Sequence, residues 1–589
     1  MFGTRRSRSG GALALTASLA FVAVASQATA DRSGSQSRSY STRLHARGQP
    51  VLQRTEAATR TDLRWSPSPS VTRALRLVEV DRPSGYAHRA HAVTGEAVGA
   101  TLAAAWHAKG FAGKGVKVAI VDAGFTGLAE RQAAGDLPAD VVTQDLCGGK
   151  FATETDHGTA VAEIVHEMAP EAELHLVCVG SETDLAAAVA YAKAQGIRVI
   201  NHSMGWEGPF RNDGSGAVGA IVADARASRI LWVNSAGNEG ESHWMGTYAG
   251  GGLHAWDANG DVGNTFIWPD GSVICGFLKW DEWPAGVSDF DLGLFLSGPN
   301  VLLTSSEEEQ GEGGGEPPFE PVCAEQTSGS DLVVFWAIRG YSVRSNPRID
   351  LVSWSPPLEH AVAAGSIATP ASSPAALAVG AVCWESRQLE PYSSQGPTVD
   401  GRVKPELVGH DSVSGATYGP FQGCPSGFAG TSASSPEVAG AAALVKQAFP
   451  AYGPDQIKQY LMRYARDLGD AGLDSVHGAG ELQLPTPPDV VAPTAKALVS
   501  TGRRGTIVKL LATVSDDSGE VSVVEQVKLG PKTVATIKRS VFVAAVGART
   551  VVTRWKVPAK AVGAYRHCIR VSDRAGNASA LSCAELVIR

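Results

Sequence analysis

The sequence predicts an α/β domain built on a parallel sheet with helices on both faces, together with an inserted β-rich domain and a C-terminal β-sandwich. Three observations support this prediction. Apolar runs alternate with amphipathic segments from about residue 95, a tryptophan- and glycine-rich stretch interrupts them, and a proline-rich linker precedes a last series of strands. At 589 residues the chain also exceeds the size at which one hydrophobic core stops growing.

The α/β domain is predicted over residues 95–245 and 363–482. Its strand candidates are apolar, β-branched runs at 116–121, 174–179, 199–203, 230–234 and 377–382. Helix candidates lie between them at 158–168, 183–195 and 215–228. Continuous apolar strands that alternate with helices are typical of a parallel sheet whose two faces are both covered. In such a sheet we expect functional side chains at the carboxyl ends of the strands.

Two further segments have the pattern of β-structure. Residues 246–362 contain WDANGDVGN and WPDGSVICGFLKWDEWPAG, in which turn signals separate short strands, and we expect an inserted β-rich domain there. After a proline-rich linker at 483–493, residues 494–589 show alternating runs such as TIVKLLATVS and RTVVTRWKV. Regular strands with turns between them predict a β-sandwich.

The first thirty residues predict export from the cell. They begin with three arginines, continue with an apolar run and end on Ala-Thr-Ala, the pattern of a secretory signal peptide. A membrane anchor is the weaker alternative because the run is short and contains hydroxyl side chains. No later run approaches eighteen apolar residues, so we expect a secreted protein that is free of the membrane after signal removal.

Charge is distributed unevenly along the chain. Residues 1–94 contain 14 arginines against 5 acidic residues, a net charge of +9, whereas residues 95–589 carry 37 basic and 54 acidic residues, a net charge of −17. The acidic body argues against nucleic acid as a partner. Residues 31–94 are either a propeptide that docks onto the acidic body before its removal or a disordered linker.

Eight cysteines in an exported chain predict disulfides. Four lie in the α/β domain, two in the insertion and two near the C-terminus, and we expect one bridge in each of the two smaller domains. A zinc site is not predicted because the chain contains no CxxC motif.

Hydrolysis of an amide needs a nucleophile, a base, a group that orients the base, and donors for the oxyanion. Asp122 ends the apolar strand VKVAIVD, and His157 begins a helix in DHGTAVAEIVHEMAP. Ser432 lies where glycine and small residues precede a long apolar helix, GFAGTSASSPEVAGAAALV. Backbone N–H groups at a helix start stabilise negative charge, which suits a nucleophilic serine.

At these residues the sequence resembles the subtilisin-like serine proteases (subtilase family, peptidase S8). The resemblance is carried by IVDAG around Asp122, HGTAVA from His157, NHSMG at 201–205, SAGN ending at Asn238, and GTSASSP around Ser432. The order Asp, His, Ser along the chain is also that of subtilisin. The resemblance implies a serine endopeptidase that acts on protein or peptide substrates through an acyl-enzyme.

The resemblance also assigns roles to individual residues. Asp122, His157 and Ser432 would form the catalytic triad, and Asn238 would donate its side-chain amide to the oxyanion. Ser203, Met204 and Gly205 would pair with the substrate backbone. Ala433 and Ala123 depart from the family's usual residues, but both are small and should leave the triad intact.

The insertion is the larger departure, because it separates Asn238 from Ser432 by 194 positions. Within it, DFDLGLFLSGPN resembles strands of jelly-roll domains found in some members of the family. The C-terminal sandwich resembles immunoglobulin-like domains, which bind a surface or the substrate, or act as a spacer.

Three other functions fit the sequence less well. A dinucleotide-binding oxidoreductase would need GxGxxG after a strand, which VKVAIVDAGFTG lacks. A zinc peptidase would need a second histidine three residues after His166-Glu167. A non-catalytic binding protein on a protease scaffold is disfavoured because every catalytic role has a candidate.

The predicted chemistry requires no cofactor. Calcium is common in the family, and Asp257, Asn259 and Asp261 stand at alternate positions of WDANGDVGN, as the oxygen ligands of a structural Ca²⁺ would. The alternative for these residues is an ordinary polar turn.

Overall fold

The computed structural model describes residues 63, 65, 75–76, 95–311, 315–517, 519–543 and 547–589. The predicted signal peptide and most of the predicted leader lie outside these residues. The chain divides into two units, residues 1–485 and 486–589, and the division falls within the predicted linker. In the part of the chain that is described, no helix is both long and apolar enough to cross a membrane.

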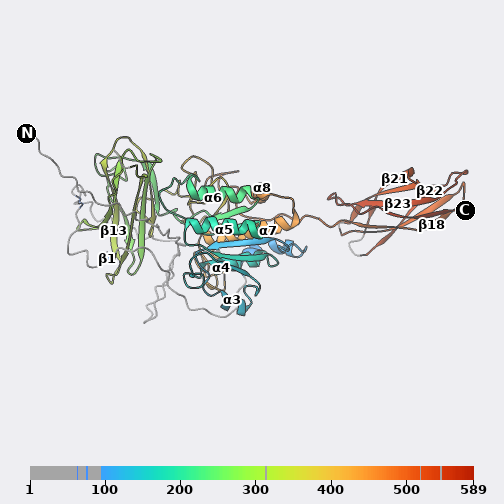
Figure 1. The fold of residues 1–589 in the computed structure, drawn as a ribbon, viewed down its shortest axis with the longest axis horizontal. Helices are drawn as coiled ribbons and strands as arrows, with labels where there is room; N and C mark the ends of the chain where they lie inside the picture. Colours follow the sequence, from blue (N-terminus) through green and yellow to red (C-terminus); the bar gives the residue numbers. More distant parts are fainter. Residues whose placement is uncertain are drawn as a thin grey trace, which may run out of the picture. The chain divides into compact units, whose positions relative to one another are not determined.

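A seven-stranded sheet lies at the centre of the α/β domain (Figure 1). In sheet order the strands are β16 (Leu407–Asp411), β15 (Ala376–Cys383), β6 (Leu231–Ser235), β5 (Val199–His202), β2 (Lys117–Asp122), β4 (Glu173–Cys178) and β3 (Val142–Asp145). Every neighbouring pair is parallel. The predicted parallel α/β architecture is confirmed, and the five predicted strands lie within one residue of their predicted bounds.

Helices cover both faces of this sheet, as the continuous apolar strands predict. The main helices are α4 (His157–Met168), α5 (Glu182–Gln195), α6 (Gly216–Ala227), α7 (Thr431–Ala448) and α8 (Pro454–Tyr464). Short helices α1 (Ala97–Ala100), α2 (Ala103–His107) and α3 (Leu128–Ala134) lie near the start. On β2, Val118 and Ile120 join the core beneath α4 and α7, whereas Ala119 and Val121 join the core beneath α5 and α6. Alternate residues of one strand therefore fill both cores.

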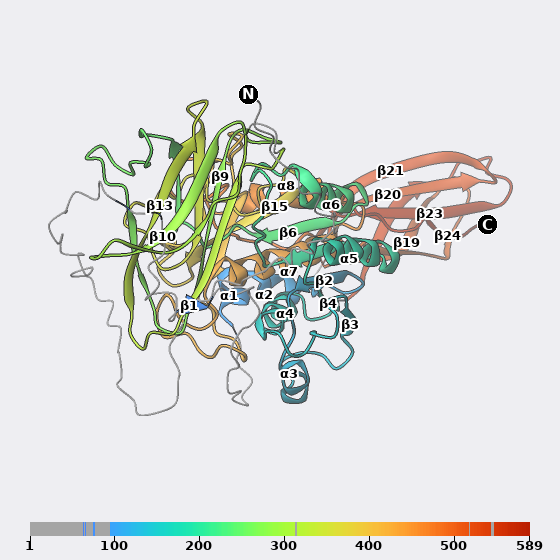
Figure 2. The ribbon, with the colours of Figure 1, turned by 60° about the vertical axis from the view of Figure 1, so that its left-hand side comes forward.

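The inserted segment folds into two antiparallel sheets (Figure 2). One sheet has the order β1 (Leu75–Arg76), β12 (Phe319–Gln326), β9 (Val273–Trp280), β14 (Arg348–Trp354) and β7 (His243–Thr247). The other has the order β11 (Val301–Ser306), β10 (Asp289–Leu296), β13 (Leu332–Ser342) and β8 (Asn264–Trp268). Trp268, Trp280 and Trp336 belong to the core of this domain and are almost completely buried.

The C-terminal unit also consists of two sheets. One contains β17 (Thr494–Leu498), β19 (Ile507–Ser515) and β22 (Arg549–Lys556). The other contains β18 (Ser500–Gly502), β24 (Ser582–Ile588), β23 (Tyr565–Ser572), β20 (Glu520–Leu529) and β21 (Lys532–Phe542). Alternating burial along β19 and β20 places one face of each strand in the core.

All eight cysteines form disulfides. The pairs are Cys147–Cys178 and Cys383–Cys424 in the α/β domain, Cys275–Cys323 in the insertion, and Cys568–Cys583 in the C-terminal unit. The expected single bridge in each of the smaller domains is confirmed.

Arg402 joins segments that precede and follow the insertion. Its Nη1 donates to the carbonyl oxygen of Ser372 at 2.9 Å, and its Nη2 donates to that of Asp213 at 2.6 Å. Hydrogen bonds from a charged donor are among the stronger ones in proteins. This side chain therefore holds the returning chain against the first half of the domain.

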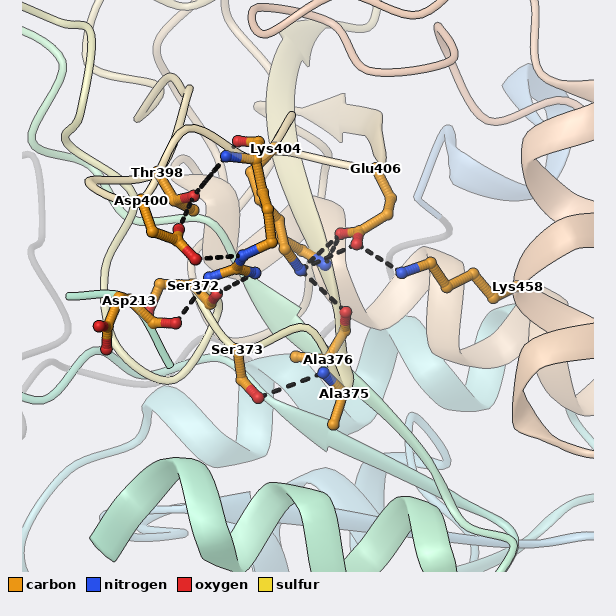
Figure 3. A network of polar contacts seen from close by, with 12 residues as sticks. Asp213, Ser372, Ser373, Ala375, Ala376, Thr398, Asp400, Lys404, Glu406 and Lys458 are labelled. Atoms are coloured by element: carbon orange, nitrogen blue, oxygen red, sulfur yellow. Dashed lines mark hydrogen bonds and ion pairs between the residues drawn. The ribbon is translucent and has the colours of Figure 1, made fainter. Parts of the chain in front are cut away.

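Lys404 anchors the same returning segment beneath the sheet (Figure 3). Its Nζ donates to the carbonyl oxygen of Ala376 and to Oε2 of Glu406, each at 2.9 Å. The side chain is 2% exposed, and burial lowers the pKa of its ammonium group to about 8. Glu406 also pairs with Lys458, whose side chain is 24% exposed.

We expect Lys404→Met to destabilise the α/β domain by roughly 3 kcal/mol, because it leaves Glu406 with one cation fewer in a buried site. Lys458→Met should cost only about 1 kcal/mol because water replaces part of its interaction. Urea unfolding followed by tryptophan fluorescence measures both changes. Equal midpoints for the two variants would contradict the dominant role of Lys404.

Candidate active site

Asp122 and His157 form a buried carboxylate–imidazole pair at the carboxyl end of the sheet. Asp122 is the last residue of β2 and His157 the first of α4. Nδ1 of His157 lies 3.0 Å from Oδ1 and 2.9 Å from Oδ2 of Asp122, and the side chains are 2% and 1% exposed. Nε2 of His157 is buried and has no hydrogen-bond partner among the described residues. The carboxylate thus fixes the ring, and the far nitrogen is available to a proton donor.

Gly158 explains why the motif has a glycine after the histidine. A Cβ at this position would lie 2.5 Å from the carbonyl oxygen of Gly124, 2.6 Å from the ring of Phe125 and 2.9 Å from Cβ of Asp122. A Cβ atom does not approach non-bonded heavy atoms this closely. Only glycine lets α4 approach the end of β2 closely enough for the imidazole to reach the carboxylate.

Ser432 is the second residue of α7, and it is joined to Ser203 by two reciprocal hydrogen bonds. Oγ of Ser432 donates to the carbonyl oxygen of Ser203 at 3.0 Å, and Oγ of Ser203 donates to the carbonyl oxygen of Ser432 at 3.1 Å. Asn201 reinforces the junction, since it donates to Oγ of Ser203 at 3.0 Å and accepts from Ser435 at 2.7 Å. The start of α7 is therefore fixed to the end of β5.

The turn before α7 depends on a carboxylate that the sequence did not single out. The backbone N–H of Gly430 donates to Oδ1 of Asp411 at 2.6 Å, and the hydroxyl of Tyr392 donates to Oδ2. Burial raises the pKa of the Asp411 carboxyl to about 7. Gly430 has a φ of 121°, a conformation that favours glycine and that starts the helix at the required angle.

Asn238 lies against the same helix start. Its Oδ1 accepts hydrogen bonds from the backbone N–H and from Oγ1 of Thr431, both at 2.9 Å. Thr431 therefore orients the amide, a role that sequence reasoning missed although the residue precedes Ser432. Met204 is held too, because its carbonyl oxygen accepts from Nδ2 of Asn234 at 3.1 Å.

These residues border a pocket with an empty volume of about 360 Å³ that opens to solvent. It is lined by Ser203, Gly205, Glu207, Ser235, Gly237, Asn238, Glu239, Trp354, Ala368, Thr431 and Ser432. The predicted nucleophile, Asn238 and two of the predicted substrate-binding positions thus share one cavity. Trp354 comes from β14, so the inserted domain contributes to the wall.

Two carboxylates in the pocket wall were not predicted. Glu207 pairs at 2.5 Å with Lys279 of β9, and both side chains are 4% exposed. Glu239 accepts from Oγ of Ser394 at 3.0 Å. Burial and, to a smaller extent, the nearby Glu207 carboxylate together raise the pKa of the Glu239 carboxyl to about 7. A sequence signal was available, since Glu239 directly follows the SAGN motif and Glu207 lies two residues after the NHSMG motif.

The residues considered for calcium form a polar turn. Oδ1 of Asp257 accepts from the backbone N–H groups of Asn259 and Asp261, and Oδ2 accepts from Nδ2 of Asn259. Oδ1 of Asp261 accepts from Gly263. Three of the four carboxylate oxygens thus accept hydrogen bonds from N–H groups of the turn itself, as an ordinary polar turn would.

Comparison with known proteins adds independent evidence. The family model described as Subtilase family matches residues 113–265 and 353–480. The chain is 26% identical over 449 residues to the minor extracellular protease Vpr of Bacillus subtilis, covering 67% of this chain and 53% of Vpr. It is 37% identical over 117 residues to subtilisin Savinase of Lederbergia lenta, covering 20% of this chain and 39% of Savinase.

Among solved structures, the Clostridium perfringens CspB protease is similar at 14% identity and a TM-score of 0.46, with 66% of this chain and 95% of that chain covered. The chain spans about half the length of Vpr and about two fifths of Savinase. The matched residues include Asp122, His157, Asn238 and Ser432 in the family's order. The α/β domain of this chain therefore belongs to the subtilase family of serine proteases.

Proposed function

We propose that this protein is a secreted serine endopeptidase in which Asp122, His157 and Ser432 form the catalytic triad. The observation that carries the proposal is the buried His157 imidazole, which is held by both oxygens of Asp122 and whose Nε2 has no hydrogen-bond partner in the part of the chain that the structure describes. Ser432 at the start of α7 is the matching nucleophile. In the structure its Oγ donates to the carbonyl oxygen of Ser203, and the proposed reaction requires a change of χ1 rotamer that turns Oγ toward the base.

In the proposed reaction, His157 removes the proton of Ser432 as Oγ attacks the carbonyl carbon of a peptide bond. Asp122 stabilises the imidazolium that forms and keeps Nδ1 protonated throughout. The imidazolium then gives its proton to the leaving amine, the C–N bond breaks, and an acyl-enzyme remains. Water, deprotonated by His157, releases the acyl group and restores the serine.

Asn238 and the backbone N–H of Ser432 are the proposed oxyanion donors. Thr431 fixes the Asn238 amide through its oxygen, so the donor is oriented before the reaction begins. Preorganised donors of this kind lower the barrier without reorganisation. Ser203, Met204 and Gly205 are proposed to pair with the substrate backbone, and no cofactor takes part in the chemistry.

Two observations support secretion. The N-terminal sequence has the pattern of a signal peptide, and the similar protein Vpr is named an extracellular protease. Processing would remove residues 1–30, and the leader 31–94 is proposed to act as a propeptide. The disulfides of all three domains suit an oxidising compartment.

We expect Ser432→Ala to reduce cleavage of a chromogenic peptide to background, because it removes the nucleophile. Asn238→Ala should lower kcat by roughly 10² to 10³ by removing one oxyanion donor. Thermal unfolding of both variants provides the control for folding. Activity of the Ser432→Ala protein equal to that of the parent would refute the proposed function.

The pocket beside Ser432 favours a cationic side chain before the cleaved bond. Glu207 is neutralised by Lys279, so Glu239 supplies the net negative charge of the wall. His243 and Asp350 are the other charged groups close to this cluster, and they pair with each other at 3.3 Å. With its pKa near 7, Glu239 is neutral in mild acid and anionic above neutrality.

We therefore expect selectivity to change with pH. The ratio of kcat/KM for peptides with Lys and with Met before the cleaved bond should rise on the order of tenfold from pH 6 to pH 8, the factor that about 1.4 kcal/mol supplies. Taking the ratio cancels the titration of the catalytic base. In Glu239→Gln the ratio should be flat, and an unchanged rise in that variant would exclude Glu239 as its source.

The C-terminal unit is proposed to bind a surface or the substrate. Its exposed apolar side chains include Val499, Ile507, Phe542 and Val562. We expect removal of residues 486–589 to lower cleavage of insoluble protein while the rate on a soluble peptide stays the same. An unchanged ratio of the two rates would leave the spacer role as the explanation.

A further inference from the structure

Strands β10 and β13 are neighbours in the four-stranded sheet of the inserted domain (Figure 2). Three of their cross-strand pairs form a socket on the outer face of this sheet. In register order these pairs are Asp291–Arg339, Gly293–Ala337 and Phe295–Phe335. The central pair is small, so it forms a floor between an aromatic wall and a charged wall. The neighbouring residues Leu292, Leu294, Trp336 and Ile338 point into the core, as strand alternation requires.

Both walls of the socket are held rigidly. The rings of Phe295 and Phe335 stack at 5.3 Å with an angle of 7° between their planes. On the opposite side, Nε of Arg339 donates to Asp291 at 2.5 Å, and Nη2 donates to Glu307 at 3.3 Å. The carboxylates fix the plane of the guanidinium, which is the orientation that stacking on an aromatic ring needs.

Trp65 of the leader occupies this socket. Its ring meets Phe295 edge to face, with the centroids 5.4 Å apart, and the guanidinium carbon of Arg339 lies 4.5 Å from its centroid. A Cβ on Gly293 would lie 2.7 Å from the Trp65 ring. The absence of a side chain at Gly293 therefore makes the space that the indole fills.

The aromatic side of the socket, formed by Phe295 and Phe335, is shielded from water by the leader. Phe295, Phe335 and Ala337 are fully buried although they are on the outer face of the sheet, where antiparallel sheets usually present polar residues to water. Leu63 and Trp65 pack against this cluster. By contrast, Val333 on the same face of β13 lies outside the cluster and is 42% exposed.

A second contact lies ten residues further along the leader. Leu75 and Arg76 form β1, which pairs antiparallel with the edge strand β12 at Gln326 and Glu325. Strand addition satisfies backbone groups of an edge that would otherwise be open.

We propose that the leader docks on the inserted domain through two contacts, Leu63 and Trp65 at the socket and Leu75 and Arg76 at the sheet edge. Trp65 anchors it in the socket and β1 adds it to the sheet edge. The leader at 31–94 contains 11 arginines and 5 acidic residues, a net charge of +6, so it is attracted to the acidic body at 95–589, whose net charge is −17. The insertion thus acts as the platform that holds the leader, independently of the pocket around Ser432.

The test uses the full chain with Ser432→Ala, so that no self-cleavage interferes, and follows trypsin cleavage after Arg76 by mass spectrometry. We expect Trp65→Ala to accelerate this cleavage roughly tenfold, because cleavage tracks the population of the undocked segment. Trp65→Phe should give an intermediate rate. Gly293→Ala, which fills the socket from the other side, should act like Trp65→Ala.

Val333→Ala is the matched control, and its cleavage rate should equal that of the parent. Equal rates for the parent, Trp65→Ala and Val333→Ala would overturn the proposal. Thermal unfolding of the Trp65→Ala protein tests for a folding defect, and Trp65 lies outside the inserted domain, so its loss removes the anchor and not the receptor. Because the chain is inactive throughout, the result does not depend on the proposed peptidase activity.

Discussion

The reciprocal hydrogen bonds between Ser203 and Ser432 are the interaction on which the rest of the site depends. They join positions 229 residues apart and fix the start of α7 against the end of β5. From this junction the helix runs beneath the sheet, and almost all of its side chains are buried. Asp411 and Thr431 then set the turn and the Asn238 amide. The start of α7, which carries the proposed nucleophile Ser432, is thus held in place before any substrate arrives.

The sequence predicted those features that depend on the residues of a single continuous segment. Continuous apolar runs predicted five strands, and the motifs around Asp122, His157 and Ser432 predicted residues that the fold brings to one edge of the sheet. Strand β3 was missed because it is polar and largely exposed, and β16 because it is short and contains glycine and histidine. Neither has the apolar pattern that identifies a buried strand.

The pocket wall could not be predicted in the same way, because its properties arise from contacts between distant segments. Lys279 reaches Glu207 from another domain, and Trp354 enters the wall from the last strand of the insertion. Nothing in the local sequence of these residues indicates that they meet. The insertion therefore affects the charge and shape of the cleft, and these two properties cannot be predicted from any single motif.

The pairing of β7 with β14 has a consequence for how this chain folds. These strands are the first and last of the insertion and lie antiparallel, with Trp244 opposite Leu351. Once they pair, the two ends of the insertion lie side by side. The two halves of the α/β domain are then joined by a short connection and not by a long flexible loop. Folding of the insertion therefore already accounts for the chain entropy that is lost when these ends are brought together. The parallel sheet then loses only the smaller entropy of closing a short connection.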